Sequence, residues 1–260
     1  MKPTSKEAYT RLMILKYVIV HALATPRPML SDLFANWSET EKKAFDDACK
    51  QKADASVASL KEINLWKHAS PKEQLFLQSF GSQMDEYEHR AATWRMECAA
   101  MIMWALGLLN SWPNIDEEIN TDLLKSVPIQ QLGFFSKHPD LRKHSEMAAK
   151  RDLIEFWHWR VRTRRLIEEG TQFEADDDMK RAGLNSYDDI IRFSARAANE
   201  KGDLPQLIDD DFVFLGKPFR SLSTDEYQLA TSIIMERHFA LNWLCGMAPG
   251  NRWDETPTDT

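Results

Sequence analysis

The chain has 260 residues, 43% apolar and 10% aromatic, so it can bury a large core and is not a disordered polypeptide. Its 33 basic and 40 acidic side chains give a net charge of −7, which argues against a nucleic acid or an anionic membrane as the main partner. The three cysteines, Cys49, Cys98 and Cys245, have no CxxC spacing and favour a reducing, cytoplasmic compartment.

The N-terminal segment predicts an amphipathic helix over residues 5–24. Apolar residues recur in it at helical spacing, and Thr25-Pro-Arg-Pro28 ends the pattern. Its basic start, apolar stretch and Ala22-Leu-Ala24 imitate a secretion signal, but Glu7 and Lys16 interrupt that pattern. We therefore expect a core helix here, and no segment of the chain is apolar for long enough to predict a membrane span.

Two capping boxes predict the next helices. Ser38-Glu-Thr-Glu41 begins a helix that continues toward Lys67. Ser70-Pro-Lys-Glu73 carries a proline at the first helical position. It begins a segment that we expect to break near Gly81 and to lead into a long apolar helix ending near Asn110.

The rest of the chain predicts further helices around a short extended region. Residues 113–138 are typical of a loop with one short helix, and a strong helix follows over about residues 139–169. A shorter helix covers residues 186–201, and residues 211–222 look like two short extended pieces around a turn. A third capping box begins the last helix, over about residues 223–247.

These elements predict an all-α fold, a bundle of about six to eight helices with a short hairpin-like segment near residues 211–222. The acidic stretch over residues 174–178 is the best candidate hinge, but long apolar helices on both sides favour one shared core. We therefore expect a single domain over residues 1–260, in which the helices of residues 1–82 pack on a core of residues 83–260.

Charged residues lie on the apolar stripes of three helices. Glu97 precedes a run that is apolar on every side, and Glu236 shares a face with Ile233 and Trp243. Because an unpaired buried charge is costly, these groups should find one another. The candidate polar cluster consists of Arg95, Glu97, Arg160, Arg164, Glu236 and Arg237, with Trp104 and Trp157 as aromatic neighbours. It is either a network that fixes helix register or a pocket for a small anionic or zwitterionic ligand.

Motifs for chemistry are weak. Two Glu-x-x-His pairs, Glu86 with His89 and Glu155 with His158, have the helical spacing of di-iron bundles, but two pairs are close to chance and the lone glutamates such a site needs do not follow the usual order. We therefore predict no metal and no cofactor. The basic segment Trp159–Arg165 is more typical of a core helix with rim salt bridges than of RNA binding. No phosphate loop, nucleophile elbow or HExxH motif is present.

Several stretches resemble an uncharacterised bacterial family, the domain of unknown function number 4272. Trp94-Arg-Met-Glu97 and Met103-Trp-Ala-Leu-Gly107 are similar to its "WRxE…WALG" signature. The other similar stretches are Glu146–Arg165, Phe214–Ser223, Glu236–Leu244, Trp253-Asp254 and Thr258–Thr260, so the resemblance spans roughly residues 90–260. The N-terminal third matches only loosely, as helices.

The resemblance implies a bacterial, cytoplasmic, largely helical protein, and it transfers no activity. It adds Trp94, Asn242, Trp243, Trp253 and Asp254 to the candidate residues. For the last two it suggests a tail that docks through its indole while the carboxylate accepts hydrogen bonds. A closing tail is more often a structural device than a site.

The sequence favours a non-enzymatic protein that binds another protein, for example as an antidote to a toxin. The first alternative is a small-ligand binder or enzyme that uses the Arg/Glu cluster in an interhelical pocket. The second is a metal-binding helical bundle. A protein binder should show an exposed apolar patch edged by acid and a filled core around Glu97, whereas a ligand binder should show an open pocket at Arg95, Arg160 or Glu236.

Overall fold

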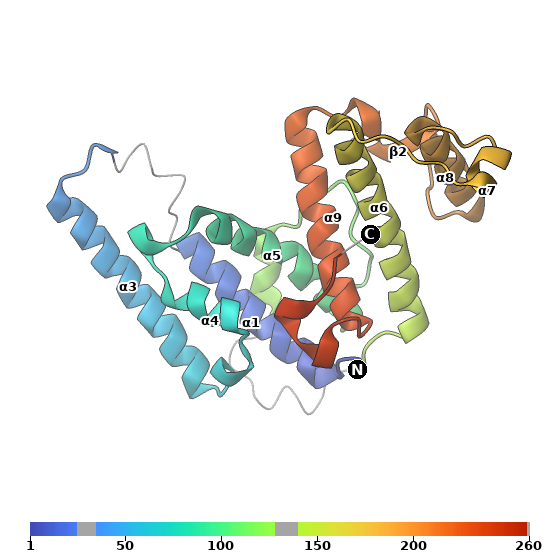
Figure 1. Cartoon of the computed structure of the whole chain (residues 1–260). Helices are drawn as coiled ribbons and strands as arrows, with labels where there is room; N and C mark the ends of the chain where they lie inside the picture. Colours follow the sequence, from blue (N-terminus) through green and yellow to red (C-terminus); the bar gives the residue numbers. More distant parts are fainter. Residues whose placement is uncertain (25–34, 128–139, 259–260) are drawn as a thin grey trace. The chain divides into compact units, whose positions relative to one another are not determined.

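The computed structural model describes residues 1–24, 35–127 and 140–258, and these residues are mostly helical with a small antiparallel sheet (Figure 1). The predicted fold class is thereby confirmed. Contacts divide the chain into two compact units. Unit 1 comprises Met1–Pro113, Glu118–Ala148 and Phe239–Pro257, and unit 2 comprises Asn114–Glu117, Ala149–His238 and Thr258–Thr260. The acidic stretch proposed as a hinge lies inside unit 2, and the single-domain prediction stays a prediction.

The long N-terminal helix of unit 1 is α1 (Ser5–Ala24), and its bounds agree with the predicted ones. It is buried on most sides rather than on one stripe, because α5 (Glu86–Ala105), α3 (Glu39–Glu62) and α4 (Pro71–Gln78) all pack against it. Even Lys16 is enclosed, and its Nζ donates to the carbonyls of Leu124 and Val127 at 2.7 and 2.5 Å. A charged side chain in the apolar run therefore anchors a neighbouring loop.

Both capping boxes in unit 1 form as predicted. Ser38 caps α3 and Ser70 caps α4, and in each case the glutamate three residues later bonds back to the cap. The α3 helix ends at Glu62 rather than near Lys67, because Asn64 takes a positive φ of 58°, and the short 3-10 helix η2 (Trp66–His68) follows.

The predicted break near Gly81 separates α4 from α5. Gly81 has a φ of +48° and begins the short 3-10 helix η3 (Gly81–Gln83). A Cβ at this position would collide with the carboxylate of Asp46 on α3, so any other residue would have to displace that side chain and also adopt a positive φ. The helix α5 ends at Ala105 and not near Asn110, since the chain turns at Gly107 with a φ of 70°.

The loop after α5 holds one short 3-10 helix, η4 (Thr121–Ser126), as predicted, and residues 128–139 lie outside the described residues. The helix α6 (His144–Glu168) begins later than the predicted residue 139. The short α7 (Asp177–Arg181) was not predicted; Asp176 caps it, so the acidic run forms a helix N-terminus. The next helix, α8 (Tyr187–Lys201), ends at Gly202 in the left-handed region, close to its predicted bounds.

A three-stranded antiparallel sheet follows α8, in the order β1 (Leu207–Ile208), β2 (Asp211–Phe214) and β3 (Lys217–Pro218). The sequence indicated β2. It placed the turn at residues 216–218 and a second extended piece at residues 219–222, whereas β3 covers Lys217–Pro218 and residues 219–221 form a 3-10 helix. The strand β1 was not predicted. Two-residue turns join the strands, and their residues, Asp209-Asp210 and Leu215-Gly216, all have positive φ. This is the backbone geometry that tight hairpins require.

The last helix is α9 (Thr224–Leu244), preceded by the 3-10 helix η6 (Phe219–Ser221). The tail forms two further 3-10 helices, η7 (Pro249–Asn251) and η8 (Trp253–Glu255). Two of the boundaries between the units fall inside α6 and α9. Within the described residues, no helix combines the length and the apolar character needed to cross a membrane.

Candidate functional site

Arg160 and Asp211 form a fully buried ion pair in unit 2. The guanidinium of Arg160 donates from Nε and Nη2 to the two carboxylate oxygens at 2.7 and 2.8 Å. The side chains are only 1% and 0% exposed. The expected partners of Arg160 were Glu97 and Glu236. Asp211 was not predicted, because it belongs to the acidic run Asp209-Asp-Asp211, and such runs are usually solvated loops. The signal that could have found it is its place directly before the apolar strand residues Phe-Val-Phe.

The Asp211 carboxylate accepts further hydrogen bonds, from the backbone N–H of Phe212 and from the backbone and Nε of Arg220. Burial by itself raises the pKa of Asp211, but these bonds and the charge of Arg160 outweigh it and hold the pKa below its ordinary value. Arg160 also lies 4.8 Å over the ring of Phe219. The carboxylate therefore stays ionised and fixes β2 to α6 and η6.

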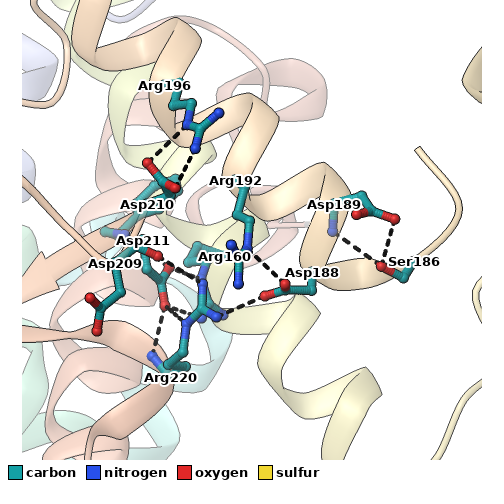
Figure 2. A network of polar contacts seen from close by, with 11 residues as sticks. Arg160, Ser186, Asp188, Asp189, Arg192, Arg196, Asp209, Asp210, Asp211 and Arg220 are labelled. Atoms are coloured by element: carbon teal, nitrogen blue, oxygen red, sulfur yellow. Dashed lines mark hydrogen bonds and ion pairs between the residues drawn. The ribbon is translucent and has the colours of Figure 1, made fainter. Parts of the chain in front are cut away.

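Around this pair a wider polar network reaches α8 (Figure 2). Arg220 extends from Asp211 to Asp188, at 2.7 Å from its carboxylate, and Arg192 pairs with the same aspartate. Beside it, the guanidinium of Arg196 donates two hydrogen bonds to the carboxylate of Asp210, at 2.8 and 2.5 Å. Alternating charges thus join α8 to the sheet. The outer pairs of Asp188 and Asp210 are partly exposed and individually weak, whereas the inner pair of Arg160 with Asp211 is fully buried.

Arg164 and Arg237 bind backbone carbonyls. Arg164 donates to the carbonyls of Phe219 and Leu222 at 3.1 and 2.9 Å and pairs with Glu168. Arg237 is fully buried and donates to the carbonyls of Asn114 and Glu117 at 2.6 and 2.9 Å. Its neighbour Glu236 is only half-buried. In unit 2, these arginines therefore serve to hold loops and helix ends in place.

In unit 1, Glu97 is completely buried on α5 and accepts the backbone N–H of Ile119 at 2.8 Å. Arg95 lies 4.8 Å over the ring of Phe239. Trp104 contacts Trp112 edge-on, and its carbonyl accepts Nε of Arg142, a residue that the sequence analysis did not single out. Trp94 is half-buried. Glu97 and Trp104 thus contact the loop that follows this helix, and Arg95 contacts Phe239.

The tail docks in unit 1 through its indole. Trp253 is 2% exposed and packs edge-on against Phe239 and Trp243, while Arg11 lies 4.9 Å over its ring. Asp254 accepts the backbone N–H of Lys72 in the first turn of α4, at 3.1 Å. Nearby, Asn242 donates to the carbonyl of Pro257. These contacts have the geometry of a structural clasp.

The weak metal candidates have other contacts. Glu86 pairs with Arg90, and His89 bonds to the carbonyl of Ala22. Glu155 pairs with Arg151, and His158 bonds through Nδ1 to Nδ1 of His238 at 2.9 Å. No group of three or more His, Cys, Asp or Glu side chains suited to a metal ion occurs within the described ranges.

The fold and these contacts define a mostly helical protein in which buried arginines, Trp157 and three phenylalanines hold a small sheet on a helical scaffold. The model of the family described as Domain of unknown function (DUF4272) matches residues 2–180, and the chain belongs to this family. The resemblance was expected over roughly residues 90–260, whereas the match covers residues 2–180 and so includes the N-terminal third. No curated protein matches the chain, and no solved structure does so.

Proposed function

We propose that this protein binds a helical segment of another protein in an apolar groove between α6 and α8 of unit 2. The groove has a volume of about 430 Å³. It is lined from α6 by Ala149, Asp152, Leu153 and Phe156, from α8 by Phe193, Ser194, Ala197, Ala198 and Lys201, and beyond α8 by Asp203. The exposed aromatic ring in this groove is the observation that carries the proposal.

The side chains of the groove suit an incoming helix. Small residues such as Ala149 and Ala197 leave depth between the two helices, and Leu153 and Phe156 form an apolar lining. Phe193 is 57% exposed. Large exposed aromatics are costly in water and are common anchors of protein interfaces. An amphipathic helix that lays its apolar face between two helices is a recurrent mode of recognition.

The rim of the groove carries both signs of charge, because the exposed Lys201 lines it together with two aspartates. Asp203 is exposed, and in the described part of the chain no hydrogen bond or ion pair involves its side chain. Asp152, on the opposite edge, is already paired with Arg151. We therefore expect the partner helix to place a basic residue against Asp203 and an acidic residue against Lys201, where the charges guide association more than they add affinity.

The two most buried members of the Arg/Glu cluster do not support an open ligand pocket. Glu97 and Arg160 are 0% and 1% exposed, so neither side chain can line a site that admits a ligand from solvent. The burial of Glu97, together with an exposed groove that carries an aromatic ring and charged edges, favours protein binding over ligand binding at Glu97 and Arg160. The antidote role, bacterial origin and cytoplasmic location stay predictions.

The test is capture of a partner from cells of the native host with wild-type chain, Phe193→Asp and a matched control, Tyr87→Asp. Tyr87 is also a highly exposed aromatic, but it lies on α5 in unit 1. We expect one protein that the wild type and the control retain and that Phe193→Asp loses. With the purified partner, the Kd should rise at least about tenfold in Phe193→Asp.

Two outcomes contradict the proposal. One is a set of captured proteins that is the same, or empty, for all three chains. The other is a homodimer in size-exclusion chromatography that only Phe193→Asp disrupts, since the occupant of the groove is then a second copy of the chain. Circular dichroism and thermal unfolding check that each variant folds.

A further inference from the structure

Unit 2 has a second concavity, between α6 and α9, which shares no lining residue with the groove described above. It has a volume of about 300 Å³. Its lining consists of His158, Val161, Arg162 and Arg165 from α6, Tyr227, Thr231 and Met235 from α9, and Thr258. An α-helix turns by about 100° per residue, so this set lies on the face of α6 roughly opposite the one that carries Leu153 and Phe156.

The arginines of the basic segment Trp159–Arg165 lie on two different faces of α6. Arg160 and Arg164 point to the sheet and its following turn, where Arg160 donates to Asp211 and Arg164 donates to two carbonyls. Arg162 and Arg165 instead line the cavity. No hydrogen bond or ion pair of the Arg162 side chain occurs within the described residues. Arg165 is 3.6 Å from Glu169, and both of these side chains are exposed.

His158 forms a fixed part of the cavity wall. It is 8% exposed, and its bond to the fully buried His238 holds its ring in place. The rings of the two histidines are 5.1 Å apart and steeply inclined. Tyr227 is held as well, because its hydroxyl donates to the carbonyl of Val161 at 3.0 Å. The cavity therefore combines a polar wall held by hydrogen bonds with two guanidinium groups, of which Arg162 has no hydrogen-bond partner among the described residues.

We propose that the α6/α9 cavity binds a small organic oxyanion, a carboxylate or a phosphate monoester. The planar fork of a guanidinium matches the oxygens of both groups. Val161 and Met235 offer an apolar wall for the organic part of the ligand. A volume of about 300 Å³ is at the lower end of known ligand sites, which restricts the ligand to a small molecule.

The test titrates the full chain with phenyl phosphate and with benzoate, and with uncharged phenol as a control for the ring. Binding is measured by calorimetry and by NMR of the histidine and arginine side chains. The test variant is Arg162→Gln/Arg165→Gln. Its control is Arg90→Gln/Arg181→Gln, which removes two exposed arginines elsewhere and changes the net charge equally.

We expect saturable binding of at least one anion, shifts of the His158 signals, and a Kd that rises more than about tenfold in the test variant but not in its control. The anion that binds tighter then identifies the ligand class. The proposal is overturned if neither anion saturates the protein, if phenol binds equally well, or if both double variants lose affinity equally. Phe193→Asp should bind the anion normally, so failure here and failure of the groove proposal are distinguishable.

Discussion

At the scale of single residues, two neighbouring aspartates differ completely in their surroundings. Asp210 lies in a turn and pairs with Arg196 at the surface, whereas Asp211 begins β2 and pairs with Arg160 inside the core. The sequence treats both as one acidic run. The point at which the turn ends and β2 begins decides which carboxylate is turned inward, and the pairing of Ile208 with Asp211 sets that point.

We expect Asp211→Ala to lower the free energy of unfolding by about 3–5 kcal/mol, since it leaves the Arg160 guanidinium buried without its partner. Asp210→Ala, which removes only an exposed pair, should cost less than about 1 kcal/mol. Urea unfolding monitored by tryptophan fluorescence measures both. Equal losses in the two variants would show that the inner pair is not the dry anchor described above.

The free energy of unfolding should also depend on pH, because His238 titrates differently in the folded and the unfolded chain. Burial, together with the nearby His158 and Arg151, lowers the pKa of His238 from 6.5 to about 4. The unfolded chain therefore binds a proton at this residue near pH 6.5 while the folded chain stays neutral, so the contribution of His238 is full above pH 6.5 and is lost as the pH falls toward 4. Between pH 7 and pH 5 this loss amounts to about 2 kcal/mol.

The measurement compares the free energy of unfolding at pH 7 and pH 5 for the wild type and for His238→Asn. The variant should show a smaller decrease, because it lacks this titrating group. The pKa of His21 is also lowered by burial, but its contribution is the same in both proteins and cancels in the comparison. An unchanged pH dependence in the variant would mean that His238 is protonated with an ordinary pKa in the folded state.

At the scale of elements, the sequence predicts where helices begin better than where they end. The capping boxes at Ser38, Ser70 and Ser223 all form, because a cap needs only hydrogen bonds within a few residues of the chain. The ends of α3 and α5 come earlier than predicted, at turns with positive φ at Asn64 and Gly107. The strand β1 was missed because its two residues are defined by pairing with β2, which is not a local property.

The helix α6 shows the same division between local and distant information. Its periodicity indicates which arginines share a face with the apolar stripe, and Arg160 is indeed buried. The periodicity does not tell what that face meets. The sheet supplies Asp211 as the partner of Arg160, whereas Arg162 and Arg165 line the cavity on another face of the helix.

At the scale of the whole molecule, we expect the two units to unfold together. Because α6 and α9 each begin in one unit and end in the other, helical order runs across two of the boundaries. We expect one calorimetric transition. Asp211→Ala in unit 2 and Trp253→Ala in unit 1, which truncates a side chain that is 2% exposed, should both lower its midpoint. Two transitions, each moved by only one variant, would contradict the prediction of a single domain.

The sequence by itself determined the helical class, most helix starts and the burial of residues such as Glu97 and Arg160, because these depend on periodicity and on hydrogen bonds between near neighbours. Tertiary structure alone decided that Asp211 neutralises Arg160, that Trp253 closes onto Arg11, and that Phe193 stays exposed beside a groove. Such pairings join residues far apart along the chain. They arise only when the elements pack, since a buried charge is stabilised by whichever opposite charge the fold brings within reach.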